Sequence, residues 1–141
     1  MNLFGILDIS ASALTAERQR AEVVTSNLAN ANTSGTKTTA YRRQEVVFSA
    51  EPVTFQSEMD AADQAARGVG VTEVIADSRK PQRRYDPSNP QADKQGFVYY
   101  PNINPVEEMT DLMDSVRSYE FNLSAIQATK SMIQQSIQLL R

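Results

Sequence analysis

Few residues in this sequence have the side-chain chemistry that catalysis or metal binding usually needs. The chain contains no Cys and no His, which excludes thiolate nucleophiles, disulfides and thiolate metal sites and removes the commonest general base. Two carboxylate pairs occur, at positions 107/108 and 111/114. They lie near the expected start of a helix, where the helix dipole already favours acidic residues. We therefore expect no catalytic residue, no metal site, no cofactor and no enzymatic activity.

A run of positive charge is the second candidate for a functional site. Residues 79–85 read RKPQRRY, and the basic patch in this run consists of Arg79, Lys80, Arg83 and Arg84. Such a run could contact nucleic acid, an anionic polymer or an acidic neighbouring subunit, or it could form a solvated loop. The whole chain has 14 basic and 17 acidic residues and a net charge of −3, which argues against nucleic acid. An inter-subunit contact and a solvated loop remain the two interpretations.

An amphipathic helix is predicted at the N-terminal end of the chain, over residues 3–32. Leu7, Leu14 and Leu28 recur at a spacing of seven residues, which is typical of one face of a packed helix. The polar residues that follow favour caps and turns, and Gly35 can adopt a positive φ. We expect the helix to end before this glycine.

A second and more regular helix is predicted over residues 105–141. Asn104 is a suitable N-cap and Pro105 suits the first helical position. Two interleaved rows at seven-residue spacing are apolar or aromatic at every position except Lys130. The other members of these rows are Met109, Val116, Leu123, Ile137, Leu112, Tyr119, Ile126, Ile133 and Leu140.

The residues between the two helices change character. Short β-rich runs separated by Pro and Gly occupy residues 36–104, and the polar stretch 56–67 is typical of a long loop. The predicted fold class is α+β, with long N- and C-terminal helices paired as an antiparallel coiled coil and a small β-rich insert between them. In this division residues 1–35 and 105–141 form the helical core domain, and residues 36–104 form the insert.

Both predicted helices have an apolar stripe that must be buried. Pairing them hides much of each stripe, but apolar residues remain on the C-terminal helix. The chain is also poor in Leu, Ile, Val and Phe for its length, so its own core must be thin. We expect self-association or a larger assembly, with an assembly core formed by Leu7, Leu14, Leu28, Met109, Leu112, Val116, Tyr119, Leu123, Ile126, Ile133 and Ile137.

The N-terminal segment is not typical of a secretory signal peptide. No Lys or Arg precedes Arg18, and Asp8 interrupts the apolar run. No uncharged apolar run approaches the roughly 20 residues of a transmembrane helix. We expect neither a cleaved signal peptide nor a transmembrane segment.

Several motifs, in order along the chain, resemble one family. Residues 26–35, SNLANANTSG, resemble the N-terminal signature of bacterial flagellar axial proteins, the rod, hook and hook-associated subunits. Residues 41–48 (YRRQEVVF), 85–90 (YDPSNP) and 117–122 (RSYEFN) are similar to the proximal-rod subgroup FlgC. Thr36 follows the signature glycine, where distal rod and hook members usually have an aromatic residue, which favours the proximal type. The resemblance defines a signature corner of Asn27, Leu28, Asn30, Thr33 and Gly35.

The resemblance implies a structural subunit of the proximal rod in the flagellar basal body. Such subunits polymerise by packing of their terminal helices into the axial drive shaft that transmits torque from the motor to the hook. The implied partners are copies of the chain, other proximal and distal rod subunits, the rod-to-base adaptor FliE and the flagellar type III export apparatus. Members of the family are exported without a cleaved signal peptide and assemble in the periplasmic space. The alternatives are a distal-rod or other flagellar axial subunit and a non-flagellar coiled-coil adaptor.

Overall fold

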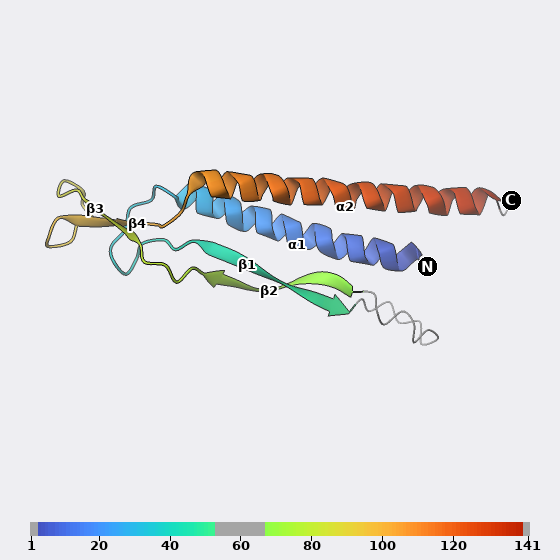
Figure 1. Ribbon diagram of the computed structural model, residues 1–141, viewed down its shortest axis with the longest axis horizontal. Coiled ribbons are helices and arrows are strands. Elements are labelled where there is room, and N and C mark those ends of the chain that lie inside the picture. Colours follow the sequence, from blue (N-terminus) through green and yellow to red (C-terminus); the bar gives the residue numbers. More distant parts are fainter. Residues whose placement is uncertain (1–2, 53–66, 140–141) are drawn as a thin grey trace.

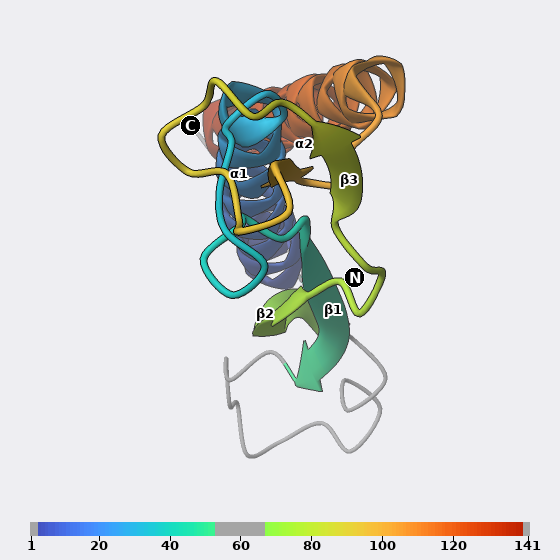
Figure 2. The same cartoon turned by 90° about the vertical axis from the view of Figure 1, so that its left-hand side faces the viewer.

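The computed structural model describes residues 3–52 and 67–139. Two long helices lie side by side, a pair of strands runs along the N-terminal helix, and a second pair of strands lies beyond one end of the helices (Figures 1 and 2). The helices confirm the sequence prediction, whereas residues 56–66 of the predicted loop lie outside the described residues and Arg67 begins a strand. In chain order the elements are α1 (Leu3–Asn30), β1 (Gln44–Pro52), β2 (Arg67–Ala76), β3 (Gln82–Tyr85), β4 (Phe97–Tyr100) and α2 (Pro105–Leu139).

Two asparagines make side-chain hydrogen bonds where the helices meet, Asn104 at the start of α2 and Asn30 at the end of α1. Asn104 is the N-cap of α2, as predicted, since its Oδ1 accepts a hydrogen bond from the Val106 amide at 3.1 Å. At the end of α1, the Asn30 side-chain amide donates to the Ser26 carbonyl at 2.9 Å. This bond ties the Asn30 side chain back onto the last turn of the helix.

The two helices run in opposite directions (Figure 1). Asn27 near the end of α1 contacts Glu108 in the first turn of α2, and the Ser115 hydroxyl donates to the Glu17 carbonyl at 2.9 Å. The row of α2 that is buried has seven-residue spacing and contains Glu108, Ser115 and Thr129. The buried residues of α1 are Ser10, Ala16, Val24 and Asn27.

The buried face of α2 is one residue away from the face that the sequence indicated. In the single chain Met109, Val116, Leu123 and Ile137 are exposed, so this row does not form the contact with α1. Small side chains at Ser115 and Thr129 allow α1 to approach closely, and the polar contacts of Glu108 set the rotation of α2. A heptad pattern marks an apolar face, but it does not tell which partner covers that face.

The strands β1 and β2 form an antiparallel ribbon on α1. Their register pairs Gln44 with Ala76 and Pro52 with Arg67, and it shifts between Val47 and Phe48, which is typical of a β-bulge. The ribbon is attached to the helix by the Val69 amide, which donates to the Ser12 hydroxyl of α1 at 3.1 Å.

The strands β3 and β4 form a second antiparallel pair beyond the helix ends. Residues 82–85 of the basic run are therefore strand, because Gln82–Tyr85 pairs with Phe97–Tyr100. The Phe97 ring of β4 stabilises this pairing through two contacts with β3. It packs edge-on to Tyr85, with ring centroids 5.3 Å apart, and the Arg83 guanidinium lies 3.8 Å above its centroid.

Gly35 joins the end of α1 to β4. Its amide donates to the Tyr99 carbonyl at 2.9 Å and its carbonyl accepts from the Tyr99 amide at 3.1 Å. The expected positive φ at Gly35 is wrong, because among the described glycines only Gly96 has one, at 79°. Gly35 is required for a different reason: a Cβ there would lie 2.6 Å from the Ala40 Cα atom.

The apolar core of the single chain is small, as the composition predicted. Among the described residues the buried hydrophobic side chains are Ala16, Val24, Ala31, Val98 and Ile103. Neither described helix combines the length and the apolar content that crossing a membrane requires.

Candidate functional site

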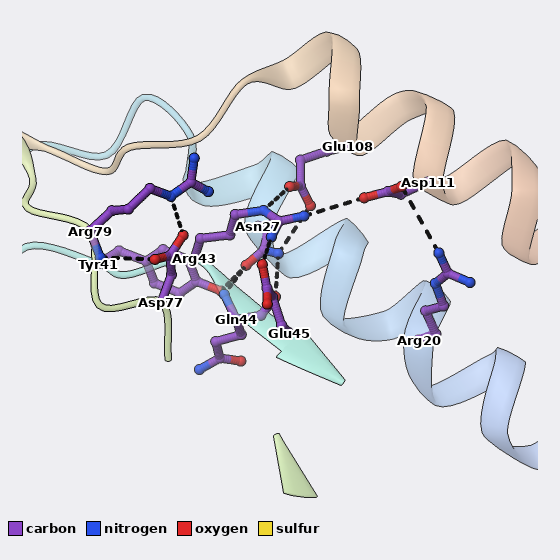
Figure 3. A network of polar contacts seen from close by, with 10 residues as sticks. All are labelled: Arg20, Asn27, Tyr41, Arg43, Gln44, Glu45, Asp77, Arg79, Glu108 and Asp111. Atoms are coloured by element: carbon purple, nitrogen blue, oxygen red, sulfur yellow. Dashed lines mark hydrogen bonds and ion pairs between the residues drawn. The ribbon is translucent and has the colours of Figure 1, made fainter. Parts of the chain in front are cut away.

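A buried cluster of polar side chains holds α1, the start of β1 and α2 together (Figure 3). We call it the polar node, and it consists of Asn27, Tyr41, Arg43, Glu108 and Asp111. The Asn27 side chain is fully buried. Its Nδ2 donates to the Gln44 carbonyl at 2.8 Å and to Glu108 Oε2 at 3.0 Å. Its Oδ1 accepts from the Gln44 amide at 2.9 Å and from the Tyr41 hydroxyl at 3.0 Å.

These four hydrogen bonds use both donors and both acceptor sites of the Asn27 amide. The amide pairs with the backbone N–H and C=O of Gln44 as a neighbouring strand would. Asn27 therefore links α1 directly to the first residue of β1. A leucine of similar size could fill the space, but it would leave the backbone groups of Gln44 without these partners.

Glu108 is the charged member of the node that lies deepest, at 0% exposure. Arg43 donates through Nε to Glu108 Oε1, through Nη1 to Glu45 and through Nη2 to Asp111 Oδ2, the last at 3.3 Å. Burial by itself lowers the pKa of Arg43, but the hydrogen bond and charge of Glu108, with Glu45 and Asp111, outweigh it and hold that pKa above its ordinary value. The guanidinium therefore stays charged.

The node continues along the helix pair through a weaker contact. Asp111 also faces Arg20 of α1, with Oδ1 and Nη2 3.9 Å apart. One carboxylate on α2 thus lies between a cation from the insert and a cation from α1 (Figure 3). The node can fix the angle and register of three elements at once, which is a mechanical role.

Two members of the signature corner lie at this junction. Asn27 is in the node, and the Asn30 side chain donates to the Ser26 carbonyl and accepts through Oδ1 from the Thr33 hydroxyl at 3.4 Å. Leu28 is half-buried, and Gly35 bridges to β4. The corner connects the helices to both pairs of strands, and each polar member has a specific partner.

The predicted assembly-core residues are distributed differently. Leu7, Leu14 and Leu28 on α1, and Leu112, Ile126 and Ile133 on α2, are half-buried. The other members are exposed on α2 together with further large apolar residues, and we call this set the apolar face. It consists of Val106, Met109, Met113, Val116, Tyr119, Phe121, Leu123, Met132, Ile137 and Leu139.

The basic patch is divided by the β3–β4 pair. Arg79 binds Asp77, and Arg83 lies over Phe97. Hydrogen bonds from the Arg79 backbone and side chain lower the pKa of Asp77. Among the described residues no carboxylate is within ion-pairing distance of Lys80 or Arg84, and both side chains are exposed.

Tyr41, Arg43 and Glu108 were not predicted as site residues from the sequence. Glu108 is an acidic residue in the first turn of a helix, and the helix dipole is a sufficient reason for an acid at such a position. Its partner Arg43 is 65 positions away, a separation at which no local pattern indicates contact. The one usable signal is that Glu108, Ser115 and Thr129 share a row of small or polar residues beside an apolar one.

Comparison with known proteins places this architecture in a class. The family model described as "Flagella basal body rod protein" matches residues 7–37, and the one described as "Flagellar basal body rod FlgEFG protein C-terminal" matches residues 94–139. The first match contains nearly all of α1 and the corner, and the second contains β4 and α2. The two matches therefore cover the paired helices that meet at the polar node.

Several relatives are similar over almost their whole length. The flagellar basal-body rod protein FlgC of Bacillus subtilis is 39% identical, with 99% of each chain covered. FlgC of Escherichia coli O6:H1 is 40% identical over 99% of this chain and 98% of its own. FlgC of Aquifex aeolicus is 40% identical over 98% and 97%. The chain belongs to the FlgC family of flagellar basal-body rod proteins, structural subunits of the rod. Membership implies assembly with other rod and basal-body proteins.

Proposed function

We propose that this chain builds the proximal rod through the apolar face of α2, which packs against helices of neighbouring axial subunits, copies of this chain included. The observation that carries the proposal is the exposure of large apolar side chains along the whole helix, from Val106 at 70% through Phe121 at 75% to Leu139 at 87%. So many large exposed apolar side chains on one helix are typical of an interaction site. A rod subunit has neighbours to cover it.

The spacing of the apolar face supports coiled-coil packing between subunits. Met109, Val116 and Leu123 recur every seven residues, which keeps a seam facing a partner helix. The last turns of α2 also extend past the N-terminal end of α1 (Figure 1). Ile137 and Leu139 belong to the last turn of α2 and are 60% and 87% exposed, so a neighbouring subunit can cover them in the assembled rod.

The remaining parts of the proposal follow from the family and the fold. The helices (1–35 and 105–141) form the axial core of the shaft that passes torque to the hook, and the insert (36–104) lies outside. Other proximal and distal rod subunits and the adaptor FliE are the neighbours. The flagellar type III apparatus exports the chain without a cleaved signal peptide to the periplasmic space, and the role is structural, without catalysis. A small core suits this route, because amphipathic helices gain most of their stability from packing.

The test replaces one exposed member of the apolar face. Val116→Asp should leave the fold of the isolated chain intact, since this side chain is 46% exposed, but it should prevent incorporation into rods by burying a carboxylate between helices. Val116→Leu, which keeps the face apolar, is the matched control. Circular dichroism of the purified chains and imaging of basal bodies give the two readouts. Normal rods with Val116→Asp would show that this face does not make the contact.

A further inference from the structure

A strongly basic groove lies beside the β3–β4 pair and shares no residue with the polar node or the apolar face. It has a volume of about 440 Å³, and none of its lining residues is acidic. Its lining includes five basic side chains: Lys37, Arg42, Arg79, Lys80 and Arg83. Of these five, only Arg79 has a described carboxylate at ion-pairing distance, that of Asp77. Cations gathered in a concave surface concentrate anions there, so the groove suits a partner that presents several carboxylates.

The first turns of α2 carry such a group of carboxylates. Glu107, Asp111 and Asp114 are three or four residues apart, so they follow one side of the helix over about 10 Å. We call these three residues the acidic stripe. The helix dipole accounts for an acid in the first turn, such as Glu107, but not for Asp114, because the effect of the dipole falls off within that turn.

Two members of the acidic stripe are available to another molecule. Glu107 is exposed, and no cation of the described residues is within ion-pairing distance of it. Asp114 has only Arg117 nearby, at 3.6 Å, and the two side chains are 55% and 76% exposed. Asp111 is already bound within the polar node. The stripe therefore offers carboxylates that the single chain leaves largely in solvent.

The acidic stripe continues into the apolar face. Glu107, Asp114 and Phe121 recur every seven residues, which places them in one row along α2. Phe121 is 75% exposed and belongs to the apolar face. A molecule that packs over Phe121 therefore also meets the carboxylates that precede it in the row, and it needs cations there. The groove supplies these cations beside the ring surfaces of Pro81 and Tyr99, which are also in its lining.

The groove and the acidic stripe of one molecule do not meet. Among the described residues no ion pair joins a cation of the groove to a carboxylate of the stripe. In both views α2 runs along the top, whereas the connection between β2 and β3, which supplies Arg79 and Lys80 to the groove, lies lower, at the level of β1 (Figures 1 and 2). Both surfaces have described positions, so a contact between them joins two molecules.

We infer that the basic groove of one copy binds the acidic stripe on α2 of a second copy. This inference rests on the proposed function and names the residues of one contact between subunits. The two surfaces are different patches of one molecule, so the contact is heterologous. Contacts of this kind propagate into open helical assemblies unless the rotation closes a ring. The charge complementarity sets which end of one copy meets the next, while the apolar face supplies the buried surface.

Site-specific cross-linking in assembled rods tests the contact directly. The chain has no Cys, so Lys80→Cys and Glu107→Cys each introduce a single reactive thiol. The two variants are expressed together in cells whose own copy of the gene is deleted, and purified basal bodies are treated with a short bismaleimide. A dimer linked between the two variants is expected, and neither variant alone should give it, because the contact is heterologous. Glu120→Cys, exposed on the opposite side of α2, is the matched control and should not link to Lys80→Cys.

Three outcomes of the cross-linking would overturn the inference. One is the absence of a link between Lys80→Cys and Glu107→Cys in rods that contain both variants. Another is equal linking of Lys80→Cys to Glu120→Cys, which would show no preference for the stripe. The third is a link from Lys80→Cys to a different basal-body protein and none to Glu107→Cys, identified by mass spectrometry of the linked peptides, which would assign the groove to that other protein.

A charge exchange in the same cells tests the attraction. Lys37→Glu/Lys80→Glu and Glu107→Lys/Asp114→Lys should each lower the number of assembled rods severalfold, because like charges then face one another. The variants change two charges at a time, since a single exposed ion pair contributes little. The chain that carries all four changes should recover rods, and no recovery would overturn the inference. Circular dichroism of the purified variants should show the wild-type fold, because all four side chains are exposed.

A matched control separates local pairing from net charge. Glu22→Lys/Glu73→Lys makes the same change in net charge at exposed positions outside the stripe. It should not restore rods to Lys37→Glu/Lys80→Glu, and restoration would overturn the inference.

The same rod counts distinguish the groove contact from the proposed function. If Val116→Asp abolishes rods while Lys37→Glu/Lys80→Glu leaves them unchanged, the groove contact is wrong and the proposed function stands. If the charge exchange recovers rods while Val116→Asp has no effect, the groove contact stands without the apolar face.

Discussion

The two ends of the helix pair are built in opposite ways. Where α1 ends and α2 begins, polar side chains from three elements satisfy one another, and Asn27 and Glu108 are fully buried. At the other end α2 runs past α1, and Ile137 and Leu139 have large exposed surfaces. The first end is held together by contacts within the chain, whereas the second leaves large apolar side chains exposed. Substitutions at the first end should change the stability of the isolated chain, and those at the second should change assembly.

The largest expected effect on stability comes from Arg43→Ala. This change leaves the buried Glu108 carboxylate without its cation, and such a loss costs about 3–5 kcal/mol of unfolding free energy. Urea unfolding followed by circular dichroism measures it. Replacing both partners, Arg43→Met with Glu108→Leu, should cost less, because no buried charge is left unpaired and the remaining loss is the acceptor of the Asn27 side-chain amide. If Arg43→Ala unfolds at the wild-type urea concentration, the node does not stabilise this end.

A smaller loss is expected for Gly35→Ala. The added Cβ would lie 2.6 Å from the Ala40 Cα atom and 2.9 Å from its nitrogen, and relieving such overlap by moving backbone costs about 1–3 kcal/mol. Gly96→Ala provides a comparison, since its positive φ costs about 1–2 kcal/mol for a residue with a side chain, and its Cβ would lie 2.9 Å from a side-chain atom, Tyr85 Cε2, instead of from backbone. Thermal unfolding of both variants ranks them. A larger loss at Gly96 than at Gly35 would show that the corner can shift around an alanine.

The pH dependence at the insert should be weaker still. Backbone hydrogen bonds from Phe97 and Gln95 and the Tyr99 hydroxyl lower the pKa of Asp93 below its ordinary value. A carboxyl group whose pKa is lower in the folded state stabilises the fold above its unfolded pKa, and this contribution disappears as the pH falls through the folded pKa. Stability should therefore decrease below about pH 4. In Asp93→Asn that part of the decrease should be absent, and identical pH profiles for variant and wild type would contradict this.

The smallest effect on the isolated chain is expected in the last turn of α2. Ile137→Asn should change the unfolding free energy by no more than about 0.5 kcal/mol, since this side chain is 60% exposed. The same change should reduce incorporation into rods, as measured by basal-body imaging against the control Gln138→Asn on the same helical turn. A clear loss of stability in solution would mean that the two ends are less different than the structure indicates.

The elements themselves could be predicted well from the sequence. The predicted ranges of both helices match the structure to within two residues at each described end, because apolar periodicity and the cap at Asn104 are local properties of the chain. The β-rich insert was predicted in outline. The strand Gln82–Tyr85 was missed, because its residues are mostly polar and charged and it is held by the Phe97 ring and by pairing with β4.

The candidate sites could be predicted only in part. Asn27 was included in the signature corner, and its position was correct, but neither Arg43 nor Glu108 was assigned a role. Gly35 was correctly predicted as a position that needs glycine, but the reason was wrong. The close approach of Ala40 requires glycine there, and its φ is not positive. Capping and turn residues can be recognised from their neighbours in sequence, whereas a steric clash between two segments depends on how the segments pack.

The sequence by itself determined the lengths of the helices, the small core and the need for partners, because these depend on composition and on spacing along one chain. Only the tertiary structure decided which face of α2 meets α1. Glu108, Ser115 and Thr129 occupy that contact, since one buried amide at Asn27 and one guanidinium at Arg43 bind the carboxylate from elements far away in sequence. Satisfying that buried charge sets the rotation of the helix, and the apolar row remains exposed in the single chain.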